Sequence, residues 1–303
     1  MKYYPQAGVK ELCGLFGKTR QAWYKQQRVR DDVVLKEAII IKTVQDIRAA
    51  MPRIGSRKLL YLLTDTLQQH DIQIGRDKFF DLLADYGLLV RRRRRRKAYT
   101  TDSNHPFRKY PNLIKGIEPL SPDQLWVSDI TYLRLAGRFG YLSLVTDAYS
   151  RKIVGYCLYP TLKTQGPLNA LQMALIQCSK QKETILIHHS DRGLQYCCTD
   201  YTTLLYDNNI SISMTEKGDP YENAIAERVN GILKEEFGLD KTFSSFEQAS
   251  AAVTTAIQTY NYKRPHASCN YLTPAEAHLM QGLLTARWSK RKNKNEYERS
   301  VRV

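Results

Sequence analysis

The order of apolar segments between residues 124 and 237 constrains the fold of this chain more than any other feature. Three strand-like runs joined by short turns come first, and they favour antiparallel pairing. A helical pattern, a fourth strand, a second helix, a fifth strand and a third helix follow. The predicted strands are residues 125–135, 140–150, 152–159, 184–188 and 210–214, and the predicted helices are residues 167–179, 201–207 and 221–237.

This order is that of the ribonuclease-H-like fold, an α/β fold in which helices flank a five-stranded mixed sheet. In that fold the first and fourth strands are neighbours at the centre of the sheet. Asp129 lies in the first predicted strand, and Asp191 follows the fourth. The topology therefore predicts that the two carboxylates lie close together, although 61 residues separate them in the sequence.

A third acidic residue, Glu227, lies in the last of these helices. Placed at about 100° per residue, this helix is amphipathic. Glu227 and Lys234 are seven residues apart, so they lie on nearly the same side and about 10 Å apart along the axis. The apolar face holds Ile225, Ala226, Val229, Ile232 and Leu233, and the opposite face holds Glu227, Asn230, Gly231 and Lys234.

Two strand-end aspartates and one helix glutamate predict a hard oxygen site for Mg²⁺ or Mn²⁺. A pair of such ions stabilises the attacking and leaving oxygens of an in-line phosphoryl transfer. The alternative is that Asp129, Asp191 and Glu227 are ordinary surface acids. That alternative holds for most single aspartates in a soluble chain, but the order and context of all three favour the metal site.

The net charge of +16 is unevenly distributed along the 303 residues. Residues 1–115 carry 25 Lys or Arg against 11 Asp or Glu, residues 116–280 carry 14 against 17, and residues 281–303 carry 7 against 2. Basic ends around a slightly acidic centre predict a polyanion partner held by the ends. We expect no membrane partner and a cytoplasmic, nucleoid-associated location, because no apolar run of about 18 residues and no signal peptide appears.

Residues 1–30 are predicted to form a helix-turn-helix-like segment, with two short helices inside residues 9–27 and a turn at Gly17. Such a unit would place Arg20 and Gln21 in a groove of DNA. A plain helical hairpin fits the same pattern equally well, because the turn signal is short.

Residues 31–97 are interpreted as a second helical DNA-binding region. One helix covers residues 33–52, a second begins with Ser56 as its N-cap, and a third begins near Gly75 and ends at Gly87. Basic residues at helix starts contact phosphates well, and a run of cations adds a salt-sensitive contact. The predicted DNA contacts here are Arg57, Lys58, Arg91, Arg92, Arg93, Arg94, Arg95, Arg96 and Lys97.

The remaining divisions follow from composition and helix signals. Residues 98–120 are predicted to be a linker, and residues 121–280 the core with two C-terminal helices, over residues 246–262 and from Thr273 onward. Residues 281–303 form a basic tail. The six cysteines show no metal-ligand spacing, which predicts reduced thiols.

Several motifs accompany these acids. They are Trp126-Val127-Ser128-Asp129-Ile130-Thr131, His189-Ser190-Asp191-Arg192-Gly193, Asn223-Ala224 through Glu227, Lys234, and Tyr260-Asn261 with Arg264-Pro265-His266. Together they resemble the motifs of bacterial insertion-sequence transposases of the IS-three type, whose second reading frame encodes a retroviral-integrase-like core. The resemblance covers nearly the whole chain and is most specific in residues 124–276.

The resemblance implies that Asp129, Asp191 and Glu227 are the catalytic and metal-binding acids. It implies that Lys234 contacts DNA near them, and Arg264 in the basic turn is a further predicted DNA contact. The implied function is a DDE-type transposase that cleaves the ends of an insertion sequence and transfers its strands with two Mg²⁺ or Mn²⁺ ions. The implied partners are double-stranded terminal repeats, target DNA, further copies of the chain, and an upstream-frame partner or fusion.

One position departs from the family pattern. Glu222 stands where the family usually has an aspartate, which makes it a rival for the third acid. The helical wheel favours Glu227, because Glu222 projects toward the apolar face. The zinc-binding module of viral integrases is absent from the sequence. Two other functions stay open: a ribonuclease-H-like nuclease and a non-catalytic DNA-binding regulator.

Overall fold

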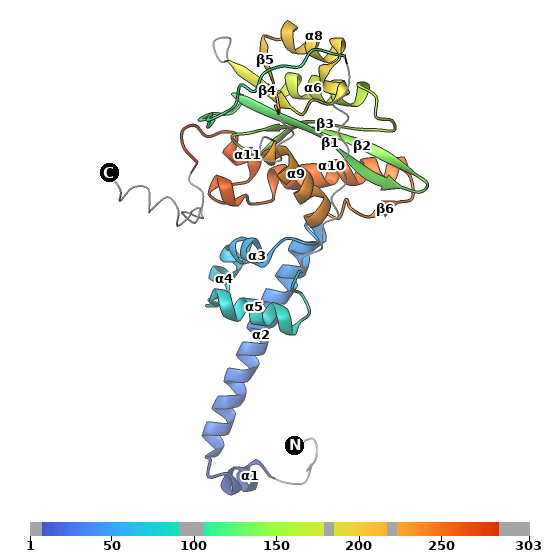
Figure 1. The fold of residues 1–303 in the computed structure, drawn as a ribbon. Coiled ribbons are helices and arrows are strands. Elements are labelled where there is room, and N and C mark those ends of the chain that lie inside the picture. Colours follow the sequence, from blue (N-terminus) through green and yellow to red (C-terminus); the bar gives the residue numbers. More distant parts are fainter. Residues whose placement is uncertain (1–7, 91–105, 179–184, 217–222, 285–303) are drawn as a thin grey trace, which may run out of the picture. The chain divides into compact units, whose positions relative to one another are not determined.

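The computed structural model describes residues 8–90, 106–178, 185–216 and 223–284 (Figure 1). The chain divides into two compact units. The first unit comprises Met1–Ala49 and Ile54–Arg92, and the second comprises Ala50–Arg53 and Arg93–Val303. All described helices of the first unit precede the strands, which belong to the second unit.

The first unit is helical, and its apolar side chains meet in a small core. Its helices are α1 (Val9–Leu15), α2 (Arg20–Ala50), α3 (Ser56–Leu62), α4 (Thr64–Gln69) and α5 (Arg76–Asp85). The apolar stripe of α2 is buried only in the second half of that helix, where α3 to α5 supply partners. The buried side chains of this core include Ile40, Val44, Ile54, Leu59, Leu63, Phe79 and Leu83.

Helix α2 corrects the prediction of two separate helices on either side of residue 30. It is one helix of 31 residues, and the predicted boundary between residues 30 and 31 falls inside it. The sequence holds no glycine or proline between its two ends. An ion pair between Asp32 and Lys36, at 2.8 Å and one turn apart, adds support at the expected break.

Two turns of this unit follow the sequence closely. Gly17 has a φ of +62°, which confirms the predicted turn after α1. Gly87 has a φ of +66° and follows the end of α5, as predicted. The N-cap of α3 is Gly55, whereas Ser56 is the first helical residue, so the prediction for this cap was wrong by one position.

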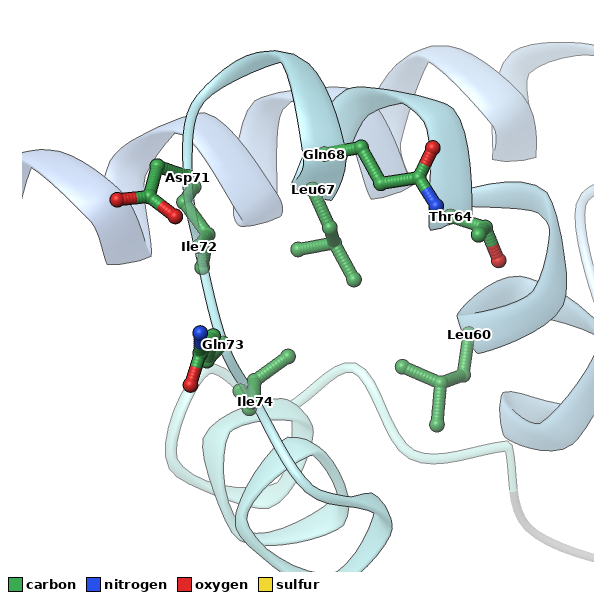
Figure 2. A pocket seen from close by; sticks show the side chains of 8 residues that line it. All are labelled: Leu60, Thr64, Leu67, Gln68, Asp71, Ile72, Gln73 and Ile74. Carbon is green, nitrogen blue, oxygen red and sulfur yellow. The ribbon is translucent and has the colours of Figure 1, made fainter.

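An open hollow lies beside α3, α4 and the segment that leads to α5 (Figure 2). Asp71 is the only charged residue among those that line it, so the hollow offers no positive charge to a phosphate. Its lining residues are Leu60, Thr64, Leu67, Gln68, Asp71, Ile72, Gln73 and Ile74.

The second unit is built on a mixed sheet in which the strands lie in the order β3–β2–β1–β4–β5. Strands β1, β2 and β3 pair antiparallel, while β4 and β5 run parallel to β1. These pairings confirm the predicted ribonuclease-H-like topology. The strands are β1 (Leu125–Leu135), β2 (Arg138–Asp147), β3 (Ile153–Tyr159), β4 (Leu186–Ser190) and β5 (Ile210–Met214).

A short sixth strand adds to the five predicted ones. This strand, β6 (Thr242–Phe243), pairs parallel with residues 134–135 at the end of β1. Two residues are too few to show a period-two pattern, so the sequence does not predict it. Phe243 is buried in the core beneath the sheet.

Helices cover both faces of this sheet (Figure 1). The helices α6 (Gln165–Gln177), α7 (Leu194–Cys197) and α8 (Thr199–Asp207) belong to one side, and α9 (Ala224–Glu236) and α10 (Phe246–Tyr262) to the other. Side chains of β1 alternate between these layers: Trp126 packs in the α6 and α8 cluster, and Leu133 in the α9 and α10 cluster. Strand alternation therefore turns Asp129, like Leu133 an odd-numbered position, toward α9.

The described part of the predicted linker, residues 106–120, has no helix or strand but is packed against the sheet. Pro111 O accepts a hydrogen bond from Met214 N at 3.2 Å. Leu113 N donates to Ser213 Oγ at 2.9 Å. This segment is thus attached to β5, while residues 98–105 of the prediction lie outside the described residues.

The C-terminal helices agree with the sequence. Helix α10 has the predicted bounds, and Thr273 caps α11 (Pro274–Ala277) through a capping box with Glu276. All six cysteines are free thiols, as predicted. Across the described ranges, no helix combines the length and apolar character that crossing a membrane requires. Residues 285–303 of the predicted tail lie outside those ranges.

Candidate active site

The two predicted aspartates meet at the centre of the sheet. Strands β1 and β4 are parallel, and their register pairs Val127 with His189. Asp129 and Asp191 each lie two residues further along their strand direction. Parallel strands run in the same direction, so residues two positions beyond a paired position lie side by side. The topology therefore brings both carboxylates close together. The charge of Asp191 raises the pKa of Asp129, so the two groups interact.

Asp129 is held by two N–H donors. Ile130 N donates to Oδ1 at 2.9 Å, and Asn230 Nδ2 donates to Oδ2 at 2.7 Å. Burial and the Asp191 charge raise the pKa of Asp129 to about 7, although both hydrogen bonds oppose this rise. A partly buried carboxylate beside a like charge is stabilised by a cation, which would satisfy both acids.

Asp191 begins a turn directly after β4. Its Oδ1 accepts a hydrogen bond from Gly193 N at 3.0 Å, which orients the carboxylate. A Cβ atom on Gly193 would lie 3.0 Å from this same oxygen. Glycine at this position therefore keeps the space beside the carboxylate open.

Glu227 lies in the first turn of α9, and its side chain is exposed. Its charge also raises the pKa of Asp129, but less than burial and Asp191 do. Among the described residues, no group of three or more His, Cys, Asp and Glu side chains is placed to hold a metal ion. The two aspartates fit a divalent cation, because they are hard oxygen donors. In the side-chain conformation of this structure, Glu227 does not join them as a third ligand. The rival Glu222 lies outside the described residues.

Two asparagines join α9 to β1. Asn223 Nδ2 donates to Ser128 O at 3.0 Å, and Asn230 Nδ2 reaches Asp129. Both amides are buried, with 7% and 6% of their surface exposed. The helical wheel groups Asn230 with the polar face, so the sequence did not predict these contacts. The seven-residue spacing of the two asparagines, about two helical turns, is the signal that could have found them.

Lys234 is half-buried on the same helix. Burial lowers its pKa, and the negative charge of Asp129 opposes that change. The ammonium group therefore lies within electrostatic reach of Asp129. Its contact with DNA stays a prediction.

Neutral buried groups lie beside Asp129 on the other face of the sheet. His188 Nε2 lies 2.7 Å from Ser128 Oγ and 2.9 Å from Tyr201 OH. Burial lowers the pKa of His188 to about 3, so the imidazole stays neutral at physiological pH. The neighbouring strands β1 and β4 are thus linked next to Asp129 without adding a charge.

The predicted DNA contacts of the first unit are accessible. Arg20, Gln21 and Arg57 are exposed, and Lys58 is partly exposed. These side chains can therefore reach a phosphate without rearrangement of the helices. The cationic run Arg91–Lys97 lies outside the described residues.

Arg264 corrects one predicted DNA contact. Its side chain is buried, with 1% of the residue exposed. Nε and Nη2 donate to the two carboxylate oxygens of Glu236 at 2.7 and 2.8 Å, and the guanidinium lies 5.6 Å from the ring centre of Tyr260. This guanidinium is already paired, so it is not available to a phosphate.

Two family models, both described as integrase core domains, match residues 119–220 and 208–274. These ranges contain the sheet with its aspartates and the helix with Glu227. The fold and the site therefore define an integrase core. Among solved structures, the catalytic core domain of HTLV-2 integrase is similar with a TM-score of 0.43 and 18% identity, and the match covers 53% of this chain and 99% of that one.

Three curated relatives extend the similarity across most of the chain. An uncharacterized 31 kDa protein of insertion element IS600 from Shigella sonnei is 31% identical over 272 residues, which are 87% of this chain and 96% of that protein. Transposase InsF of insertion sequence IS3A from Escherichia coli K12 is 30% identical over 277 residues, or 91% and 95%. A putative transposase of IS986/IS6110 from Mycobacterium tuberculosis H37Rv is 30% identical over 228 residues, or 73% and 80%. The chain therefore belongs to the IS3 family of insertion-sequence transposases, as its motifs predict.

Proposed function

We propose that Asp129, Asp191 and Glu227 are the catalytic residues of this transposase and that they bind divalent metal, Mg²⁺ or Mn²⁺. The observation that supports this proposal most is the pair of like-charged aspartates at the centre of the sheet, one of them with its pKa raised to about 7. Two ions bound there would stabilise the attacking and leaving oxygens of an in-line phosphoryl transfer. The reaction would cleave the ends of the insertion sequence and then join them to target DNA.

Four side chains of this region would bind the metal ions and the DNA backbone. Asp129 and Asp191 would supply oxygen ligands from the rigid sheet, while Glu227 would approach them from α9. The exposed position of Glu227 leaves its side chain free to change rotamer. Lys234 would pair with a phosphate next to the acids, because its ammonium lies within reach of Asp129.

The helical N-terminal region would hold the DNA. We assign this role to the accessible Arg20, Gln21, Arg57 and Lys58, and to the run Arg91–Lys97. Residues 121–280 would then form the catalytic domain. The partners in this proposal are the double-stranded terminal repeats and target DNA, bound by several copies of the chain at the nucleoid, with or without an upstream-frame partner. Family membership favours this function over a ribonuclease-H-like nuclease.

Conservative changes of the three acids test the assignment. Asp129→Asn, Asp191→Asn and Glu227→Gln should each abolish metal-dependent joining of terminal-repeat DNA, while the affinity for that DNA stays close to the wild-type value. Asp200→Asn, which changes an exposed acid at the start of α8, serves as the matched control and should join DNA normally.

Each alternative has its own outcome in this assay. Joining that survives in Glu227→Gln but is lost in Glu222→Gln would move the third acid to Glu222. Cleavage of RNA–DNA hybrids in preference to terminal repeats would indicate the nuclease. A wild-type chain that binds repeat DNA but never nicks it with Mg²⁺ or Mn²⁺ would indicate a non-catalytic regulator.

A further inference from the structure

The amide of Asn230 makes an unusual set of contacts. Its Nδ2 donates to Asp129 Oδ2 at 2.7 Å. Its Oδ1 is buried and accepts no hydrogen bond from the described part of the chain. Burying an amide oxygen that accepts no hydrogen bond is costly. Buried polar atoms without a partner are rare in native proteins. The amide of Asn230 is such a case, and its hydrogen bond goes to the carboxylate of Asp129, a proposed catalytic residue.

Asn223 provides a comparison within the same region. It is buried to nearly the same extent, its Nδ2 also donates to β1, and its Oδ1 also has no partner within the described residues. Its acceptor, however, is the backbone oxygen of Ser128. A bond to the backbone stabilises the packing of α9 on β1, but it leaves the side chain of Asp129 unaffected. Asn223 is the N-cap residue of α9 and Asn230 lies inside the helix, but the difference that matters for Asp129 is that the acceptor of Asn230 is the carboxylate itself.

The two N–H donors of Asp129 together orient its carboxylate. Ile130 N donates to Oδ1 at 2.9 Å, and Asn230 donates to Oδ2. With one donor on each oxygen, rotation about the bond to the carboxylate would break a hydrogen bond. Each oxygen accepts in two directions, so each keeps a second direction for another ligand. The arrangement restrains the carboxylate without closing it to a ligand.

We infer that Asn230 is a positioning residue, which sets the orientation of the Asp129 carboxylate for the ligand that Asp129 and Asp191 share. This inference rests on the proposed function of the two aspartates. Asn230 lies three residues after Glu227 on α9, about one helical turn. The same helix therefore carries the third acid and the restraint on the first, so a displacement of α9 changes both together.

The test measures metal binding apart from catalysis. Mn²⁺ binding to the full chain is followed without DNA by the electron paramagnetic resonance signal of free Mn²⁺. The variants are Asn230→Ala, Asn223→Ala and Asp129→Asn, and thermal unfolding of each variant checks its fold. If Asn230→Ala does not fold, Asn230→Ser takes its place. In parallel, the Mg²⁺ concentration that gives half-maximal strand transfer is determined for each variant.

We expect Asn230→Ala to weaken Mn²⁺ binding roughly tenfold or more, in the range that loss of a supporting hydrogen bond to a ligand produces. Excess Mg²⁺ should restore much of its strand transfer. Asn223→Ala should lower the melting temperature by a similar amount but leave Mn²⁺ affinity within about twofold, since its acceptor is not the carboxylate.

Two results would overturn the inference, and they are distinguishable. If Asp129→Asn loses Mn²⁺ binding while Asn230→Ala binds as the wild type or as Asn223→Ala does, Asn230 only stabilises packing and the proposed function stands. If the wild type binds no more Mn²⁺ than Asp129→Asn, the proposed metal site itself is wrong, and the role of Asn230 falls with it.

Discussion

Arg264 and Glu236 form a bidentate ion pair that joins the turn after α10 to the last turn of α9. The two hydrogen bonds are 2.7 and 2.8 Å long, and the arginine side chain is 2% exposed against 15% for the glutamate. The Tyr-Asn…Arg-Pro-His motif thus supports the helix that carries Glu227.

Arg264→Ala should therefore act on stability. Removing one partner of a buried pair leaves the other charge uncompensated, which costs about 3–5 kcal/mol. Urea denaturation of the full chain would measure this loss. The salt dependence of DNA binding should stay unchanged, whereas Arg57→Ala should reduce the slope of log affinity against log salt by about 1 if Arg57 contacts a phosphate. A stable Arg264→Ala chain with a reduced slope would restore the predicted DNA contact.

Acid should destabilise the second unit through His188. The pKa of this imidazole is lowered to about 3 by burial, while an unfolded histidine titrates near about 6.5. The unfolded chain binds the proton first as pH falls, so the folded state loses stability between these two values, at most about 1.4 kcal/mol per pH unit. The unfolding free energy of His188→Gln, measured from pH 7 to pH 4, should fall less steeply than that of the wild type. Equal slopes would show that folding does not lower the pKa of His188.

Gly155 in β3 allows α6 to approach the sheet closely. A Cβ atom at this position would lie 2.0 Å from Ala170 O and 2.9 Å from Ala174 N, both in the helix backbone. Gly155→Ala should cost about 1–3 kcal/mol or more, because backbone cannot move aside cheaply. In Gly140→Ala the new atom would contact only side chains, the nearest being Leu158 Cδ1 at 3.2 Å, so its thermal unfolding should shift less. Equal shifts would contradict the close packing of α6.

The side-chain amide of Asn261 pairs with the backbone of Ile153 at the start of β3, as the backbone of a neighbouring strand would. Its Oδ1 accepts from Ile153 N at 3.0 Å and its Nδ2 donates to Ile153 O at 2.9 Å. Asn261→Ala leaves a buried donor and acceptor unpaired, at about 1–3 kcal/mol for each group. Asn208→Ala, which removes an exposed amide with one hydrogen bond, should change the unfolding free energy by less than about 1 kcal/mol. Similar losses in both variants would argue against the role of Asn261.

Local patterns predicted the elements well because strands and helices of ordinary length show their period in the sequence. Strand β1, strand β5 and helix α10 have the predicted bounds. The prediction failed where the deciding contact is not local. The expected break near residue 30 does not occur, because α2 continues through it, and β6 forms only because β1 offers it an edge.

In the candidate site, too, the local sequence predicted some features and missed those that depend on contacts between distant residues. The order of two aspartates and a glutamate predicted which acids belong together, and the parallel register of β1 and β4 brings Asp129 beside Asp191. The helical wheel assigned Asn230 to the polar face, and the basic turn after residue 262 suggested that Arg264 contacts DNA. A wheel describes one helix in isolation, so it cannot show which neighbouring side chain a polar residue meets.

The sequence by itself determined the fold class, the family and the identity of the candidate acids, since all three depend on residue types and their order along the chain. Only the tertiary structure decided how the surrounding polar groups are paired. Packing of α9 against β1 turns Asn230 from a surface amide into the donor to Asp129. Packing of α10 against α9 likewise buries Arg264 against Glu236. These pairings depend on the distance and burial of residues far apart in the sequence, which local order does not encode.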